Sequence, residues 1–254
     1  MSTASTTTHE PLLTSMQLKQ YQDEGYTVVR GLIPVDVLPP VRAELLRVEA
    51  GDSVWPDEHL HVCHPDYVKN PKGGKLVAGL QLPAKRSEVF RRVSEHANMI
   101  GAMSEILGGP VKPFTDQAGI KSRLITSEQG GRTFYHQDSY YWHIDPQLGC
   151  NCWLPLDEVG KDAIALAIIP RSQRDWKLQE HEHYFDDPPY MGGRATEPFK
   201  RHRIPNSSVD FSKEVLVPMS PGDALFFTNY TWHRSEPNYT RKTLSFYAIA
   251  YQRQ

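Results

Sequence analysis

The chain has 254 residues, of which 23% are charged, and it carries a formal net charge of -2 at pH 7. This nearly balanced charge gives no electrostatic reason to expect binding to nucleic acid or to acidic membranes. No apolar run approaches the roughly 20 residues that a membrane-spanning helix needs, so we expect no membrane partner. The length suits one large domain with its own core.

The start of the chain and its cysteines indicate where in the cell the protein is expected. Residues 1–14 begin with a polar run rich in Ser and Thr and lack the apolar core of a secretory signal. We predict a disordered tail over 1–14 and a single domain over 15–254. Cys63, Cys150 and Cys152 are too few for a disulfide framework, so a reducing, cytoplasmic location is the simplest expectation.

The N-terminal third of the domain carries helical patterns. A helix is predicted over 16–24, with Ser15 as a possible N-cap and Gly25 as its C-terminal stop. The other predicted elements of this region are a strand over 26–30, a helix over 35–50 and two helices within 87–107.

Beyond residue 110 the pattern changes to short apolar or alternating runs separated by Gly, Pro, Asn and Asp. Such runs are typical of an all-β sandwich or barrel. The predicted strands cover 119–126, 149–156, 164–170, 214–217, 224–228 and 242–251. Helices followed by strands predict an α+β fold, in which the N-terminal helices buttress one face of a β core.

One long stretch, residues 171–213, fits neither pattern. It is rich in charged residues, His, Pro and Gly. A connection of this length inside a compact domain is usually functional, so we expect a lid or substrate loop. We call residues 171–213 the lid segment.

The segment FYHQDSYYWH at 134–143 holds two candidate metal ligands, His136 and Asp138. On a strand, residues i and i+2 face the same side, so the imidazole and the carboxylate are expected to point together. A second segment, PGDALFFTNYTWH, runs from a turn through an apolar strand to His233. Two His and one carboxylate form a facial triad, which leaves positions open on iron(II) for a bidentate co-substrate and O2.

A hydroxyl and a basic residue follow His233. Arg241 is expected on the next strand, where its planar guanidinium can bind a carboxylate through two hydrogen bonds. Ser235 is placed to donate a further hydrogen bond to that carboxylate. A 2-oxo diacid needs a metal for its oxo-acid end and a cation for its far carboxylate, so these residues indicate that class of co-substrate.

Two other interpretations compete with the iron site. A buried His near a strand end is more often structural than a ligand, and the chain has 11 His. The order of H-x-D, apolar strand, distal His and basic residue favours the metal site. A zinc site at His59, His61 and Cys63 is a weaker alternative, because no second ligand pair follows at zinc spacing.

With these residues the chain resembles the phytanoyl-CoA dioxygenase family of iron(II)- and 2-oxoglutarate-dependent oxygenases. The resembling segments are DEGYTVVRGLIP, FYHQDSYYWH, CWLPLDE with AIALAIIPRS, and PGDALFFTNYTWHRSEPN with Arg241. The resemblance implies a double-stranded β-helix, or jelly-roll, core. It implies that His136, Asp138 and His233 bind iron(II), and that Arg241, with help from Ser235, holds the far carboxylate of 2-oxoglutarate.

The resemblance also implies a reaction in which 2-oxoglutarate and O2 are consumed, succinate and CO2 are released, and a substrate C–H bond is oxidised. Related halogenases carry a small residue where this chain has Asp138, so hydroxylation or another halide-free oxidation is expected. Lys121 and Arg123 lie on one face of the strand before the metal motif. One of them is expected to contact 2-oxoglutarate or the substrate, and the choice between them stays open.

The substrate is expected to be a small, polar metabolite or natural-product intermediate, because the lid segment is polar. The candidate substrate contacts are Tyr140, Tyr141, Trp142, His143 and Arg194. Packing in the core is an equal alternative for the aromatic residues among them. For the whole chain the alternative is a non-catalytic metal-binding jelly roll, and a monomer or homodimer is expected.

Overall fold

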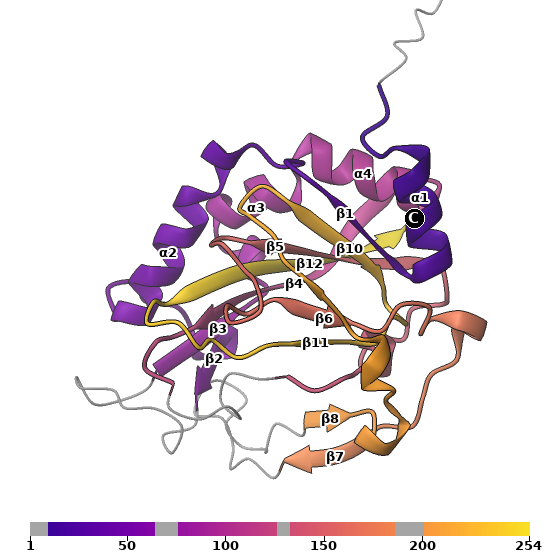
Figure 1. Cartoon of the computed structure of the whole chain (residues 1–254). Helices are drawn as coiled ribbons and strands as arrows, with labels where there is room; N and C mark the ends of the chain where they lie inside the picture. The colour runs from indigo at the N-terminus through magenta and orange to yellow at the C-terminus, as the bar shows by residue number, and fades with distance from the viewer. Residues whose placement is uncertain (1–9, 64–75, 126–132, 186–200) are drawn as a thin grey trace, which may run out of the picture.

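The computed structural model describes residues 10–63, 76–125, 133–185 and 201–254. At its centre lies a seven-stranded sheet in the order β1-β10-β5-β12-β4-β3-β2 (Figure 1). Its strands are β1 (Tyr26–Val29), β2 (Leu60–Cys63), β3 (Leu76–Gln81), β4 (Val111–Lys121), β5 (Gly149–Pro155), β10 (Ala224–Thr228) and β12 (Leu244–Arg253). All neighbouring strands of this sheet run antiparallel.

Helices from the N-terminal part of the chain cover one face of this large sheet (Figure 1). They are α1 (Ser15–Glu24), α2 (Pro39–Ala50), α3 (Glu88–Ser94) and α4 (Ala97–Leu107). Their buried residues, such as Leu45 and Phe90, pack in one core with strand residues such as Ile120 and Ile249. Alternate strand residues point to opposite sides, so the other face of the sheet is left for a second layer.

That second layer is a three-stranded sheet in the order β11-β6-β9. Its strands are β6 (Leu166–Ile168), β9 (Val215–Val217) and β11 (His233–Ser235). A second core, which includes Trp153, Ile168, Val217 and Phe227, lies between the two sheets. Two sheets packed face to face, with helices on the outer side of one, confirm the predicted α+β jelly roll.

The first helix begins one residue earlier than predicted, because Thr14 rather than Ser15 is its N-cap. The Thr14 hydroxyl accepts a hydrogen bond from the Gln17 backbone N–H at 3.2 Å, and Gln17 Oε1 accepts one from the Thr14 N–H at 2.8 Å. This reciprocal pair is a capping box. Gly25 ends the helix in the left-handed conformation, with φ of 84°, as predicted.

The chain is ordered before the predicted end of the 1–14 tail. Residues 1–9 lie outside the described residues. Leu13, however, is only 2% exposed. Its N–H and that of Leu12 each donate a hydrogen bond of 2.9 Å to the Glu105 carboxylate, which fastens this segment to α4.

Two other boundaries differ for identifiable reasons. The helix predicted over 35–50 is divided into a 3-10 turn, Val35–Val37, and α2, which begins at Pro39. Proline is accepted in the first turn of a helix but not in its interior. The strand predicted over 119–126 instead runs from Val111 to Lys121. Its first residues were missed because they are exposed and show no apolar alternation.

The described part of the lid segment contains a two-stranded antiparallel sheet, formed by β7 (Glu182–Phe185) and β8 (Arg201–Arg203). Directly after β8, the Ile204 N–H donates a hydrogen bond of 2.7 Å to the carbonyl oxygen of Tyr135. The lid segment therefore contacts Tyr135, which directly precedes His136 in the chain.

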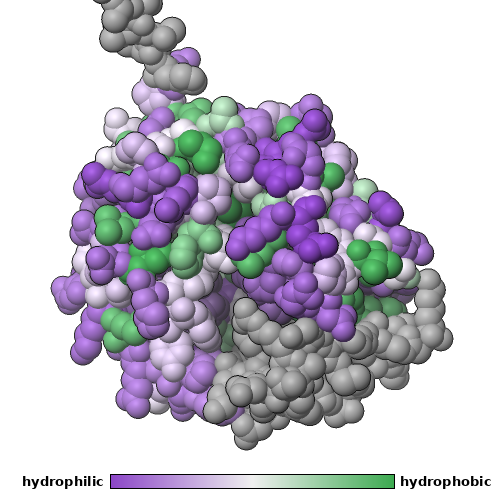
Figure 2. Space-filling model, turned by 180° about the vertical axis from the view of Figure 1, so that it is seen from behind, coloured by the Kyte–Doolittle hydropathy of each residue, from purple (hydrophilic) through white to green (hydrophobic). Residues whose placement is uncertain are grey.

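The face of the molecule opposite to the view of Figure 1 is mainly hydrophilic where its residues are described. On the face shown in Figure 2, hydrophobic residues form small separate groups among hydrophilic ones. None of the helices in the described ranges is long and apolar enough to cross a membrane.

Candidate metal centre

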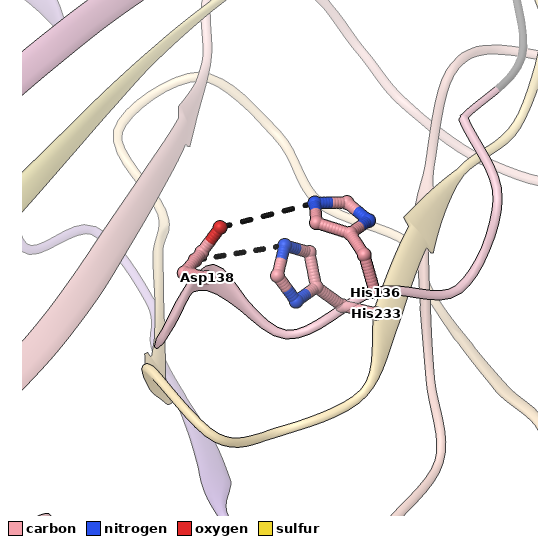
Figure 3. A group of neighbouring side chains, drawn as sticks. All are labelled: His136, Asp138 and His233. Carbon is pink, nitrogen blue, oxygen red and sulfur yellow. Dashed lines mark ion pairs between the residues drawn. The ribbon is translucent and has the colours of Figure 1, made fainter. Parts of the chain in front are cut away.

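His136, Asp138 and His233 come together at one point (Figure 3), with one potential ligand atom of each within 4.8 Å of the others. Nε2 of His136 lies 3.8 Å from Oδ1 of Asp138, and Nε2 of His233 lies 3.7 Å from Oδ2. Among the residues that the structure describes, these three form the one such group of potential metal ligands.

The elements that carry the ligands differ from those predicted. His136 and His233 pair through an isolated antiparallel bridge, in which the His136 N–H donates to the His233 carbonyl at 3.2 Å. Asp138 begins a 3-10 turn, Asp138–Tyr140, instead of continuing a strand. His233 opens β11 in the smaller sheet, whereas it was expected at the end of the preceding apolar strand. The bridge holds the imidazoles together, and the turn directs the carboxylate toward them.

Both imidazoles are oriented by backbone carbonyl groups. Nδ1 of His136 bonds to the Phe134 oxygen at 2.8 Å, and Nδ1 of His233 bonds to the Thr231 oxygen at 2.9 Å. A carbonyl oxygen only accepts, so each Nδ1 carries the proton and each Nε2 lone pair is left for a ligand. Metal-binding histidines are commonly held in this way.

A buried amide holds the carboxylate. Nδ2 of Asn151, on β5, donates a hydrogen bond of 2.6 Å to Oδ2 of Asp138. Burial raises the pKa of Asp138, and His233 and this hydrogen bond act in the opposite direction. Burial lowers the pKa of His136 to about 3, with a further contribution from His233. Two imidazoles that direct Nε2 toward the site and a buried carboxylate are a donor set that fits iron(II).

A cavity of about 660 Å³ lies beside these ligands and is lined by His136 and Asp138. Lys121, the last residue of β4, lines the same cavity, and its Nζ donates a hydrogen bond of 3.1 Å to Ser235 Oγ. Thr133 Oγ1 donates to the same Ser235 oxygen at 3.1 Å. The Lys121 ammonium and the Thr133 hydroxyl therefore both lie within hydrogen-bond distance of the Ser235 hydroxyl at this site.

The structure places the two predicted arginines elsewhere. Arg241 is exposed in the turn before β12 and does not line the cavity. It was expected on the strand, but β12 begins only at Leu244. Arg123 is exposed in the turn that follows β4. Of the basic residues predicted to bind the co-substrate, Lys121 is the one that lines the cavity.

The predicted substrate residues divide into two groups. Tyr141 and Trp142 line the cavity. Tyr140 instead stacks on an imidazole of the lid segment, with ring centroids 4.2 Å apart, and His143 is exposed to solvent. Arg194 lies outside the described residues.

The lid segment is attached to the metal site through Gln137, the residue between the first two ligands. Its Nε2 donates a hydrogen bond of 3.0 Å to the Lys177 carbonyl, and its Oε1 accepts one of 2.8 Å from the Gln179 N–H. At the other end of the lid segment, the His202 N–H donates to the Tyr141 hydroxyl at 3.3 Å. His202 itself lines the cavity.

Sequence reasoning missed Asn151 and Thr133. Asn151 is a polar residue within the fully buried strand GCNCWLP, and that contrast is a signal that it has a specific partner. Thr133 carries no comparable local signal, because only the folded chain brings it to Ser235.

The chain as a whole is similar to known proteins. The family model for phytanoyl-CoA dioxygenase (PhyH) matches residues 21–243. Ectoine dioxygenase from Stutzerimonas stutzeri (strain A1501) is 25% identical over 172 residues, which make up 66% of this chain and 50% of the relative. The chain thus spans about half the length of that curated relative.

Solved structures share the fold. The epimerase SnoN, in complex with Fe3+, alpha ketoglutarate and nogalamycin RO, has a TM-score of 0.66 at 17% identity, covering 94% of this chain and 82% of its own. EctD from S. alaskensis, with 2-oxoglutarate and 5-hydroxyectoine, has a TM-score of 0.68 at 15% identity, covering 97% and 78%. The family match includes all three potential metal ligands. The chain belongs to the phytanoyl-CoA dioxygenase family.

Proposed function

We propose that the protein is an iron(II)- and 2-oxoglutarate-dependent oxygenase that oxidises a C–H bond of a small, polar molecule. The observation that carries this proposal is the triad of His136, Asp138 and His233 beside a cavity that Lys121 also lines. A divalent metal and a cation on the same cavity provide the two binding groups that a 2-oxo diacid needs.

The three ligands would hold iron(II), which with 2-oxoglutarate and O2 supplies the oxidant and yields succinate and CO2. The protein contributes a fixed geometry. The carbonyl groups of Phe134 and Thr231 hold the imidazoles. Burial around Asp138, which is 7% exposed, keeps bulk water away from the reacting groups.

We assign the far carboxylate of 2-oxoglutarate to Lys121 and Ser235 rather than to Arg241. The Lys121 ammonium and the Ser235 hydroxyl are already within hydrogen-bond distance of one another, at 3.1 Å. A carboxylate that joined them would receive charge-assisted hydrogen bonds. Arg241 lies in an exposed turn that does not line the cavity.

Hydroxylation is the expected outcome of the oxidation, rather than halogenation. Asp138 occupies the carboxylate position of the triad and is held there by Asn151. A halide-binding site would need this position to be free of a carboxylate. The relatives that bind small molecules, such as EctD with 5-hydroxyectoine, support a small-molecule substrate for this chain as well.

The proposal is tested by incubating the protein with iron(II), ascorbate, 2-oxoglutarate and O2 and measuring succinate. We expect slow succinate formation even without the prime substrate, and its loss in His136→Ala and Asp138→Ala. Arg123→Ala, at an exposed position, serves as the control. Iron binding without succinate formation by the wild type would instead support the non-catalytic alternative.

A further inference from the structure

The cavity face of β4 separates a charged region from an uncharged one. Ala118 and Ile120 pack in the core under the helices, so Gln117, Gly119 and Lys121 face the cavity. Lys121 lies at the co-substrate region, beside Ser235. Gln117 lies four residues away, which is roughly 13 Å along a strand.

The uncharged region carries two amides side by side. Gln117 on β4 pairs directly with Gln81 on β3, and both line the cavity. Nε2 of Gln81 bonds to Nε2 of His61, which fixes the orientation of that amide. Each amide offers both donors and an acceptor, so this pair suits hydroxyl or carbonyl groups.

These amides are near the metal ligands. Thr115, two residues before Gln117 on the same face of β4, pairs with Ala250 of β12, and Ala250 pairs with Asn151 of β5. Asn151 donates its hydrogen bond to Asp138. The row of strand residues that holds the metal-binding carboxylate is therefore next to the row that contains Gln117.

Two glycines allow close packing in this part of the cavity wall. Gly79 and Gly119 are paired neighbours on β3 and β4, and both line the cavity. A Cβ at Gly79 would overlap the Ala118 carbonyl oxygen, and one at Gly119 would overlap the Phe246 ring. Side chains are thus excluded at both positions, and the Phe246 ring, which also lines the cavity, lies over Gly119 and adds an aromatic surface.

Aromatic side chains line the same cavity. Phe134, Tyr141 and Trp142 all belong to its lining. Trp142 is held by Phe114, whose ring meets it edge-on with centroids 6.0 Å apart. Large, rigid aromatic surfaces pack well against the apolar face of a ring.

Besides Lys121, the described residues of this lining include no lysine or arginine. Lys121 is assigned to 2-oxoglutarate, and Asp138 is a metal ligand. The carboxylate of Asp116 accepts hydrogen bonds from the Tyr247 hydroxyl at 2.7 Å and the Ala84 N–H at 2.9 Å. Because Tyr247 packs under the helices, Asp116 is turned away from the cavity. An anion beside Gln117 would therefore have no lysine or arginine as a partner among these residues, whereas the two amides suit neutral hydroxyl or carbonyl groups.

From these observations we infer that the prime substrate is a neutral molecule with an oxygenated ring, bound through its hydroxyl or carbonyl groups by Gln81 and Gln117. The inference rests on the proposed function, because it assigns Lys121 to 2-oxoglutarate. It predicts that acyl-CoA thioesters and carboxylates bind more weakly in the substrate region than a neutral ring does.

The test measures binding to the zinc-substituted protein with 2-oxoglutarate, by saturation-transfer NMR. The probes are methyl glucoside, which is a neutral ring, methyl glucuronide, which is the same ring with a carboxylate, and decanoyl-CoA. We expect methyl glucoside to bind most tightly. Gln81→Leu and Gln117→Leu should each weaken its binding about fivefold, the effect of one lost hydrogen bond.

Gln252→Leu, on β12 and outside the cavity lining, is the matched control and should leave binding unchanged. Gln117→Glu keeps the side-chain shape and should selectively weaken methyl glucuronide, which makes the test independent of the leucine variants. Tighter binding of methyl glucuronide or decanoyl-CoA, or no binding of methyl glucoside at millimolar concentration, would overturn the inference.

This experiment separates the inference from the proposed function. Zinc supports no turnover, so the binding order of the probes does not depend on oxygenase chemistry. Succinate formation by the iron-loaded protein needs no prime substrate. Succinate formation together with preferred binding of an anionic probe would refute the neutral substrate and leave the oxygenase intact.

Discussion

Nδ2 of Asn151 donates a hydrogen bond to Oδ2 of Asp138 across 2.6 Å, and both side chains are buried. The bond joins one carboxylate oxygen of Asp138 to β5, which is a strand of the large sheet. The 3-10 turn alone leaves the carboxylate free to rotate, so the amide sets how Asp138 faces the two imidazoles. An outer partner of this kind favours metal binding, because it fixes the orientation of the ligand.

Replacing Asn151 should therefore weaken metal binding. We expect Asn151→Ala to lower iron(II) affinity roughly 10- to 100-fold, the range seen for outer partners of metal ligands. Competition with a chelator of known affinity measures the change. Asn206→Ala, at an exposed position in the lid segment, is the control. Equal affinities for the Asn151 variant and the wild type would show that the hydrogen bond does not position Asp138.

The co-substrate assignment predicts a contrast between two basic residues. Lys121→Met should weaken 2-oxoglutarate binding roughly 10- to 100-fold, because a hydrogen bond to a charged group contributes about 1.5–3 kcal/mol. Arg241→Met should leave it unchanged, because Arg241 is exposed outside the cavity. Anaerobic calorimetric titration of the iron-loaded protein measures both. The reverse order would return the role to Arg241.

The ion pairs of Arg234 predict a loss of stability. Between the two buried residues His233 and Ser235, Arg234 points the other way and pairs with Glu214 at 2.7 Å and Glu236 at 2.6 Å. Glu214 also accepts a hydrogen bond of 2.6 Å from Tyr135. We expect Glu214→Ala to lower the free energy of unfolding by about 1–3 kcal/mol, because it leaves polar groups without this partner.

Urea denaturation followed by circular dichroism measures this change. Lys213→Ala removes a neighbouring side chain whose 3.0 Å pair with Asp210 is exposed, and it should change stability by less than about 0.5 kcal/mol. Similar losses in the two variants would mean that the Arg234 pairs contribute no more than a surface ion pair.

The attachment of the lid segment predicts a local change in hydrogen exchange. Gln137→Ala removes the acceptor of the Gln179 N–H and should speed exchange of that amide roughly tenfold or more. Glu180→Ala changes an exposed side chain of the same segment and should have no such effect. Exchange at Gln179 that stays slow in the Gln137 variant would show that other contacts hold the lid segment.

Much of the fold could be predicted because local patterns determine it. Gly25 ends α1 as predicted, and the strand predicted over 224–228 coincides with β10. The strands β2 and β3 were not predicted, because the burial of their residues alternates poorly. β2 is the edge strand of the large sheet and β3 is its neighbour. Such strands take their conformation from pairing with neighbours, which a local pattern does not report.

The site shows the same division. His136, Asp138 and His233 could be predicted because their residue types and order are specific to a metal site. The role of Arg241 was predicted from its spacing, but the length of the turn before β12 decides its position. The meeting of Lys121 with Ser235 depends on pairing between distant strands, so the sequence alone left Lys121 and Arg123 equally open.

The most direct test of the proposed function is anaerobic addition of iron(II) and then 2-oxoglutarate to the purified protein, followed by visible absorption. The proposed chelation of the metal by the 2-oxo acid predicts a charge-transfer band that saturates at one equivalent of iron(II) per chain. The band should be absent in His136→Ala. A wild-type protein that gives no band, or a His136→Ala variant that gives the same band, would contradict the assignment of this triad as the oxygenase centre.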